Sequence, residues 1–212
     1  MHDIAELVDG YRRFRADSYP KHADLYRTLA ETGQSPKVMV IACCDSRADP
    51  ATIFGAGPGQ LFVVRNVANL VPPFEPDGDD PGTSAALEFA VTGLEVETIL
   101  VMGHTRCGGV RAFLDGLDGG SPAPGFVARW MSRLDPARTQ ALRAAAEAPP
   151  AARQQALEHA SIRHSIDNLK SFPFIAERVS AGRLRLRGAC FDIADGRLLG
   201  LDPDNGNFAP VS

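Results

Sequence analysis

The sequence lacks the features that would place it in a membrane or on nucleic acid. No run of about 18 apolar residues is present, so a membrane-spanning helix is not expected. Its first residues, Met1 to Glu6, lack the basic and apolar regions of a signal peptide. Lys and Arg number 22 against 26 Asp and Glu, and the net charge of −4 argues against a nucleic-acid-binding surface. We therefore expect a soluble, cytoplasmic protein with no membrane and no nucleic-acid partner.

Cysteine is scarce as well, with four residues in a chain of 212. So few cysteines suit a reducing compartment better than a disulfide framework. Internal repeats and low-complexity linkers are also absent. The length and the hydrophobic content of 44% are sufficient for one α/β domain with a sizeable core, so we expect residues 1–212 to form a single domain.

Two short motifs carry the residues of a metal site. Cys43 opens Cys-Cys-Asp-Ser-Arg, and His104 opens His-Thr-Arg-Cys-Gly-Gly, which contains Cys107. Cys43, His104 and Cys107 form a Cys2His set for Zn²⁺, and three protein ligands leave a fourth position for water or substrate. That is the ligand count of a catalytic zinc. The first motif also carries Asp45 and Arg47, which a purely structural zinc site would not need.

Each motif follows a short apolar run. Residues 38–42 lead into Cys43, residues 98–102 lead through a glycine into His104, and residues 60–64 end at Arg65 and Asn66 in the same way. Uninterrupted runs of this kind predict strands buried on both faces, as in a parallel sheet covered by helices. Ligands bind at the carboxyl edge of such sheets, so the motifs should meet there.

The flanking regions complete an α/β fold with a central, mostly parallel sheet. Residues 1–33 predict a helical arm that Pro20 breaks into two pieces. The arm has apolar residues at helical spacing, namely Ile4, Leu7, Val8, Tyr11 and Phe14. We assign residues 34–117 to the zinc-binding sheet core, in which Asp80 and Pro81 predict a helix start. Residues 118–212 should add helices and an antiparallel edge formed by residues 183–191 and 197–201.

The motifs together resemble the β-class carbonic anhydrases, which are zinc enzymes that hydrate carbon dioxide. The resemblance rests on Cys43-x-Asp-Ser-Arg, on residues 62–69 and on Gly103-His-Thr-x-Cys-Gly-Gly, and it continues into residues 163–169 and 191–193. It implies a lyase that converts carbon dioxide reversibly to bicarbonate and a proton by zinc-bound hydroxide. It also implies that the arm packs across a second subunit, which gives a homodimer, and the choice between a dimer and a tetramer stays open.

Asp45 and Arg47 have a role that chemistry and resemblance both suggest. A carboxylate two residues after a ligand could itself bind the zinc and close the site, and a bidentate pair with Arg47 would hold Asp45 away from the metal. Asp45 is therefore a metal ligand only in a closed state. The resemblance assigns the pair to orienting the zinc-bound hydroxide, and the alternative is a simple salt bridge at the sheet edge.

The resemblance also places residues at a substrate pocket. Gln34, Phe62, Val67 and Phe89 match positions that line the cavity, with Gly108 beside it. Phe89 replaces a tyrosine that is common there, so a hydroxyl is lost. The three apolar side chains could instead belong to the core, and Gln34 could serve a turn. Gly108 and the glycine after it could allow close backbone approach at a helix start.

Two residues before the first motif indicate the subclass. Family members that bicarbonate switches off carry a tryptophan and a glycine where this chain has Val40 and Ala42. The resemblance is thus to the ungated, plant-like subclass.

Other reactive side chains have ordinary structural interpretations. Cys44 should be a buried small residue that points away from the metal, and Cys190 should serve packing. His22, His159 and His164 could shuttle protons, although a lone helical histidine is usually structural or solvated. Two alternatives to the function stay open, namely hydrolysis of carbon disulfide or carbonyl sulfide, and a zinc-stabilised binding module without turnover.

Overall fold

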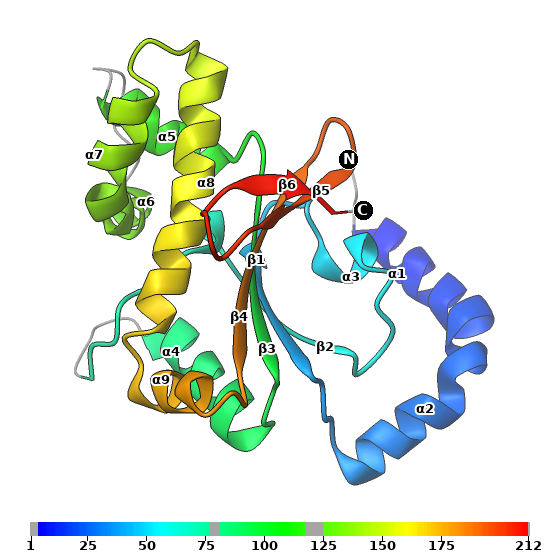
Figure 1. The fold of residues 1–212 in the computed structure, drawn as a ribbon. Helices are drawn as coiled ribbons and strands as arrows, with labels where there is room; N and C mark the ends of the chain where they lie inside the picture. The colour runs from blue at the N-terminus through cyan, green and yellow to red at the C-terminus, as the bar shows by residue number, and fades with distance from the viewer. Residues whose placement is uncertain (1–3, 77–80, 118–124, 212) are drawn as a thin grey trace. The chain divides into compact units, whose positions relative to one another are not determined.

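The computed structural model of this chain describes residues 4–76, 81–117 and 125–211 (Figure 1). The chain divides into two compact units, Met1–Ser35 and Pro36–Ser212. Among the described helices, none is long and apolar enough to cross a membrane.

The larger unit is built on a six-stranded sheet with the order β2-β1-β3-β4-β5-β6. The strands are β1 (Val38–Cys43), β2 (Leu61–Asn66), β3 (Thr98–His104), β4 (Arg185–Asp192), β5 (Arg197–Leu201) and β6 (Phe208–Pro210). The pairs β1–β2, β1–β3 and β3–β4 are parallel, whereas β4–β5 and β5–β6 are antiparallel. A mostly parallel sheet with an antiparallel edge confirms the predicted fold class.

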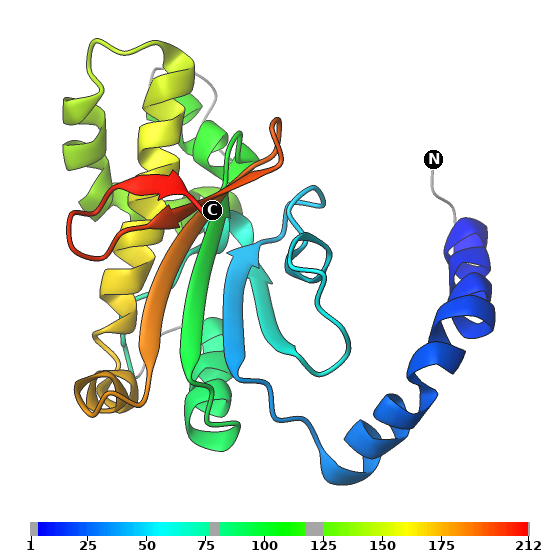
Figure 2. The ribbon, with the colours of Figure 1, turned by 45° about the vertical axis from the view of Figure 1, so that its right-hand side comes forward.

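Helices pack against the sheet and against one another (Figure 2). They are α3 (Pro50–Ile53), η2 (Val67–Asn69), α4 (Pro81–Glu88), η3 (Phe89–Gly93), α5 (Gly108–Leu117), α6 (Gly125–Met131), η4 (Ser132–Leu134), α7 (Asp135–Ala144), α8 (Pro150–Leu169) and α9 (Pro173–Ser180). Helix α4 begins at Pro81 as predicted, and its expected cap, Asp80, lies outside the described residues.

The main core lies between the sheet and helices α4, α8 and α9. Strand side chains such as Ile41 and Val101 pack there with Ile162 of α8, and all three are fully buried. Side chains that alternate with these point to the opposite face, where Val40 and Ala42 pack against the residues around α3. Burial on both faces explains why β1 reads as a continuous apolar run.

Two strand residues opposite helix α8 are glycines, and Ile162 of the helix packs where their side chains would lie. A Cβ added to Gly103 of β3 would lie 2.8 Å from Cδ1 of Ile162. A Cβ added to Gly188 of β4 would lie 2.9 Å from Cγ2 of the same side chain. Side chains at these two positions would therefore push the helix outward.

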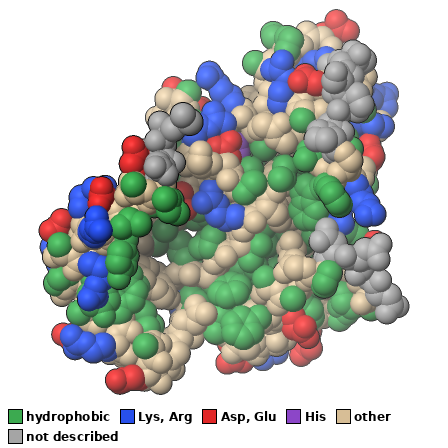
Figure 3. All heavy atoms as spheres, turned by 180° about the vertical axis from the view of Figure 1, so that it is seen from behind, with side chains coloured by type: hydrophobic (Ala, Val, Ile, Leu, Met, Phe, Trp, Pro, Cys, Tyr) green, Lys and Arg blue, Asp and Glu red, His purple; other side chains and the backbone are tan. Residues whose placement is uncertain are grey.

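The N-terminal unit contains α1 (Ile4–Arg13), the π-helical turn η1 (Phe14–Ser18) and α2 (Tyr19–Thr32). None of its described helical residues is buried, and apolar side chains such as Leu7 and Tyr11 are 63% and 60% exposed. Hydrophobic side chains on the surface of the molecule are seen in Figure 3. The arm divides into two α-helices as predicted, with Pro20 in the first turn of α2. The chain stays helical between them through η1, where the Tyr19 N–H bonds to the Phe14 carbonyl five residues back.

The C-terminal edge extends further than the sequence analysis expects. The strand pair predicted for residues 183–191 and 197–201 is present, as β4 (Arg185–Asp192) and β5. The short β6, paired with β5 through Leu199 and Pro210, is an additional strand. Its three residues include a proline, which occurs in sheets at edges, and this explains why the segment has no strand signature.

Candidate metal centre

Three potential metal ligands meet at the carboxyl edge of the parallel strands. Cys43 is the last residue of β1, His104 is the last residue of β3, and Cys107 directly precedes α5. All three side chains are buried, and their ligand atoms lie within 4.8 Å of one another. The two Sγ atoms are 3.9 Å apart. The structure therefore brings together the three residues that the sequence analysis selects.

The His104 ring is oriented with one nitrogen directed into this cluster. Its Nδ1 lies 2.9 Å from the carbonyl oxygen of Thr105, so Nδ1 carries the proton and donates it. Nε2 is buried and has no hydrogen-bond partner among the described residues. A buried polar atom without a partner is costly, and coordination of a cation would remove that cost.

The Cys43 sulfur lies in surroundings that favour its anionic form. The pKa of this thiol is lowered to about 4, mainly by the hydrogen bond that the Cys107 thiol donates to it. The N–H of Ala68 adds a contact of 3.4 Å to the sulfur. Ala68 has a φ of 61°, a left-handed conformation that is strained for alanine and turns this N–H toward the thiol.

Side chains of α8 form hydrogen bonds with both the N–H and the carbonyl of Cys107. Its N–H donates to Oε1 of Glu158 at 2.8 Å, and its carbonyl accepts from Nε2 of Gln154 at 3.2 Å. Gln154 also donates to the same Glu158 oxygen at 2.9 Å. Glu158 is only 3% exposed, and burial raises its pKa. These contacts form a clamp that fixes the position of Cys107.

Asp45 and Arg47 form a bidentate ion pair beside the cluster. Nε and Nη2 of Arg47 donate to Oδ1 and Oδ2 of Asp45 at 2.9 and 2.7 Å, and the Arg47 N–H adds a bond of 3.0 Å to Oδ1. These bonds hold the pKa of Asp45 well below its usual range. Oδ2 of Asp45 lies 3.8 Å from Nε2 of His104, so the carboxylate is adjacent to the ligand atoms.

Arg65 supports the same loop from the neighbouring strand. Its Nε donates to the carbonyl of Cys43 at 2.9 Å, and its Nη2 donates to the carbonyl of Asp45 at 2.7 Å. Nη1 pairs with Asp49, which caps α3. One guanidinium thus fixes the turn between β1 and α3 that carries the Asp45–Arg47 pair.

The donor set fits Zn²⁺. Two sulfurs and one imidazole nitrogen are ligands that zinc prefers, and three of them leave one position open. The unpartnered Nε2 of His104 is the observation that favours a metal over a simple hydrogen-bonded cluster.

Comparison with known proteins agrees with this site. The family model described as carbonic anhydrase matches residues 38–198, which include every ligand candidate. The chain belongs to the carbonic anhydrase family. A carbonic anhydrase from Pseudomonas aeruginosa is 38% identical over 99% of this chain and 92% of its own length. Chloroplastic β carbonic anhydrase 5 of Arabidopsis thaliana is 40% identical over 90% of this chain and 62% of its own length.

Solved structures place this carbonic anhydrase in the β class. The β-carbonic anhydrase CcaA superposes with a TM-score of 0.91 at 30% identity, covering 99% of this chain and 92% of that one. A β-carbonic anhydrase of Sordaria macrospora, from a structure that describes tetramers, superposes with a TM-score of 0.83 at 27% identity, covering 99% and 98%.

The residues predicted to line a substrate pocket lie in several places in this carbonic anhydrase. The rings of Phe62 and Phe89 pack against each other, with centroids 5.9 Å apart, and Phe89 is 53% exposed. Val67 belongs to η2, next to Ala68 and the Cys43 sulfur. Gly108 begins α5. Gln34 belongs to the N-terminal unit, so the place of Gln34 in the pocket stays a prediction.

Gly108 and Gly109 are both expected to allow a neighbouring segment to approach the backbone closely, and only Gly109 does so. A Cβ on Gly108 would have no neighbour within 4 Å, whereas a Cβ on Gly109 would lie 2.6 Å from Cγ1 of Val67. The expectation is therefore wrong for Gly108 and confirmed for Gly109.

The cysteines and histidines outside the metal cluster also differ in their environments. Cys44 is exposed, so its predicted burial is wrong, because the strand ends at Cys43 and the core no longer covers the next residue. Cys190 is fully buried in the main core, as predicted. His159 is structural: it stacks on Phe208 with ring centroids 4.0 Å apart.

Polar residues of α8 support the site, and no motif in the sequence predicts this role. Glu158 and Gln154 clamp Cys107, and Oγ of Ser165 bridges the carbonyl of Asn69 and the N–H of Val71. A signal was present, because residues 154, 158, 161 and 165 place polar side chains at helical spacing on a buried face of this helix.

Proposed function

We propose that this chain catalyses the reversible hydration of carbon dioxide to bicarbonate and a proton with one Zn²⁺ held by Cys43, His104 and Cys107. The observation that carries the proposal is the convergence of these three ligand atoms beside a carboxylate that a guanidinium holds by two bonds. Three protein ligands leave a metal position open where water can be activated, and an anchored carboxylate beside it could orient that water.

When bound, Zn²⁺ would supply the Lewis acid that makes water a nucleophile at moderate pH. Cys43 and Cys107 would bring two negative charges to it, which offset the charge of the metal. We therefore expect the activity to be still rising above pH ~7, in contrast to a site of three neutral histidines.

Asp45 would orient the reacting hydroxyl group. Its lowered pKa keeps it ionised, so it can only accept a hydrogen bond, and its position 3.8 Å from the ligand atom of His104 puts it within reach of the open position. Arg47 would prevent Asp45 from binding the metal. Because both oxygens are already engaged by Arg47, the arrangement supports an open resting state.

The substrate would enter through an apolar region that the partner subunit completes. The exposed Phe89, packed on Phe62, and the exposed apolar stripe of the N-terminal helices both need a cover, which supports a homodimer that can pair into a tetramer. Val67 and Gly108 would border the cavity from η2 and α5, and Gln34 would contribute from the arm. A cytoplasmic location remains part of this proposal.

The enzyme would lack a bicarbonate switch. Val40 and Ala42 are fully buried against the residues around α3, so neither offers a polar or aromatic group that could hold a closed state. This supports the ungated, plant-like subclass.

Stopped-flow hydration of carbon dioxide, combined with zinc analysis of the same preparation, tests the proposed function. We expect one zinc per chain and a rate that requires it. Zinc-loaded protein without hydration activity would contradict the proposal, and turnover of carbon disulfide or carbonyl sulfide in its place would identify the alternative substrate.

A further inference from the structure

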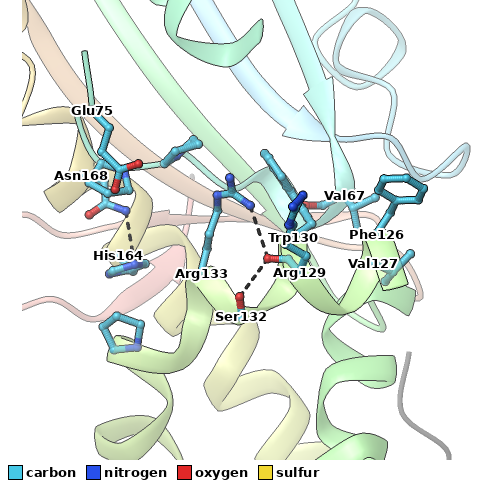
Figure 4. A pocket seen from close by; sticks show the side chains of 13 residues that line it. Val67, Glu75, Phe126, Val127, Arg129, Trp130, Ser132, Arg133, His164 and Asn168 are labelled. Atoms are coloured by element: carbon cyan, nitrogen blue, oxygen red, sulfur yellow. Dashed lines mark hydrogen bonds between the residues drawn. The ribbon is translucent and has the colours of Figure 1, made fainter. Parts of the chain in front are cut away.

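A cavity that none of the three metal-ligand candidates lines lies next to the metal centre. It has a volume of about 870 Å³ and lies between the segment after η2, helix α6 with η4, and helix α8 (Figure 4). Val67 lines this cavity, and its neighbour Ala68 donates to the Cys43 sulfur. The volume is within the range of pockets that hold small organic ligands.

The two ends of this cavity differ in chemistry. Glu75 lies beside His164 and Asn168 at one end, whereas Phe126 and Val127 lie at the other (Figure 4). Phe126 is 89% exposed, which is a high value for so large an apolar side chain. An exposed aromatic ring at the mouth of a cavity is suited to packing against a flat ligand.

Cationic groups lie in the same wall as the aromatic rings. The guanidinium of Arg133 stacks on the Trp130 ring, 4.5 Å from its centroid, and Arg129 lines the cavity one residue before that tryptophan. In the part of the chain that the structure describes, the Arg129 guanidinium has no hydrogen-bond or ion-pair partner. Guanidinium groups beside aromatic faces recognise planar anions, because they combine stacking with paired hydrogen bonds.

Trp130 connects this cavity to the metal ligands. Its Nε1 donates to the Val67 carbonyl at 2.7 Å, and the next residue, Ala68, holds the Cys43 sulfur from a strained left-handed conformation. Val67 itself is wedged against Gly109, beyond Cys107. A ligand that moves the Trp130 ring would therefore move the peptide that bonds to a metal ligand.

We propose that this cavity binds a planar organic anion, with the carboxylate on Arg129 and the ring against Trp130 and Phe126, and that binding alters the rate at the metal centre. The first half concerns binding alone and does not depend on the proposed reaction. The effect of binding on the metal centre rests on the proposed function, because it is measured as a change in the rate of carbon dioxide hydration.

Trp130 provides a direct measurement, because it is the single tryptophan of the chain. We would titrate the zinc-loaded protein with 4-nitrobenzoate, a planar anion that quenches tryptophan fluorescence, and with 4-nitrobenzamide, its neutral counterpart. We expect saturable quenching by the anion and at least about tenfold weaker binding of the amide, since bonds to a charged group are the stronger ones. Absence of saturable quenching, or equal affinity for both probes, would overturn the proposed site.

Variants separate this cavity from the metal centre. Arg129→Gln should weaken binding of 4-nitrobenzoate at least about tenfold, and the control Arg111→Gln, on the exposed surface of α5, should leave it unchanged. A probe held by the zinc would bind Arg129→Gln with unchanged affinity, and this result would overturn the proposal.

The hydration rate tests whether binding in the cavity affects the metal centre. In the wild-type protein, we expect the rate to change with the concentration of 4-nitrobenzoate and to be half-changed at the concentration that gives half of the fluorescence quenching. In Arg129→Gln, we expect the rate not to respond to the probe. Saturation of the cavity with no change in rate would overturn the coupling to the metal centre.

Discussion

Arg47 engages both carboxylate oxygens of Asp45, with its Nε 2.9 Å from Oδ1 and its Nη2 2.7 Å from Oδ2. The pair closes over only one intervening residue, so the turn after β1 fixes the direction of the carboxylate. The Arg47 side chain is half exposed, whereas the Asp45 side chain is 16% exposed. Of the two residues in this ion pair, Asp45 therefore lies nearer to the three metal-ligand candidates.

Replacing Arg47 separates positioning from metal binding. Arg47→Ala should retain zinc, because no ligand is lost, but should lower the hydration rate by about a hundredfold or more, because the carboxylate loses its fixed orientation. Arg47→Lys should recover little, since an ammonium cannot bond to both oxygens in this geometry. Rates from stopped flow between pH 6 and 9, with zinc content, check this. Arg111→Ala is the control, and an undiminished rate in Arg47→Ala would contradict the proposed role.

Removing one sulfur should remove the metal. Cys107→Ser is expected to lose most of its zinc during dialysis, because a neutral hydroxyl is a poor replacement for a thiolate. Cys44→Ser is a matched control, because this cysteine lies next to Cys43 but is exposed. Zinc per chain, measured by atomic emission, should fall only in the first variant. Full retention there would show that the ligand assignment is wrong.

The clamp from α8 should contribute to stability through its acceptor oxygen. Glu158→Ala would leave the buried N–H of Cys107 without a partner and should lower the free energy of unfolding by about 1–3 kcal/mol. Glu158→Gln retains an acceptor and should cost less. Urea denaturation of the zinc-loaded proteins measures both, with Glu97→Ala, which breaks an exposed pair with Lys37, as the control. Equal losses for the alanine and glutamine variants would argue against the hydrogen bond as the cause.

The buried His159 should make stability depend on pH. Burial lowers its pKa from 6.5 to about 4, with a smaller contribution from the charge of Arg163. As the pH falls from 6.5 to 4, the unfolded chain binds a proton at this residue and the folded chain does not. Its contribution to stability is therefore present above pH 6.5 and lost as the pH falls through this window.

His159→Phe should reduce this dependence while keeping a ring stacked on Phe208. It also removes a buried Nε2 atom that has no hydrogen-bond partner among the residues described. Melting temperatures of both proteins from pH 7 to pH 4 give the comparison, and parallel curves would show that another group carries the effect.

The N-terminal helices should be required for assembly. Light scattering on the full chain should give a dimer or tetramer, and a protein lacking residues 2–33 should be insoluble or inactive, because the arm exposes apolar side chains that are expected to pack on a second subunit. An active, well-folded monomer after this deletion would contradict the proposal.

The sequence predicts the group of three metal-ligand candidates well because each ligand is marked by the residues next to it. Cys43 and His104 each end a continuous apolar run, and parallel strands bring such ends together at one edge. The bidentate pair of Asp45 and Arg47 also follows from local spacing.

Contacts between distant elements could not be predicted in this way. Glu158 reaches Cys107 from a helix that starts far along the chain, and its side chain resembles that of any surface glutamate in the sequence. The left-handed conformation of Ala68 has no residue signature either, since glycine is the residue expected there. The burial predicted for Cys44 is wrong because the alternation of strand side chains ends with β1 at Cys43.

The two glycines under α8 have a consequence for the metal centre. Ile162 occupies the space that side chains at Gly103 and Gly188 would fill, and one helical turn earlier the same helix presents Glu158 to the backbone of Cys107. A side chain at either glycine would displace α8 from the sheet, and Glu158 would move with the helix. We therefore expect the packing of the core beneath α8 to influence how well the clamp holds Cys107.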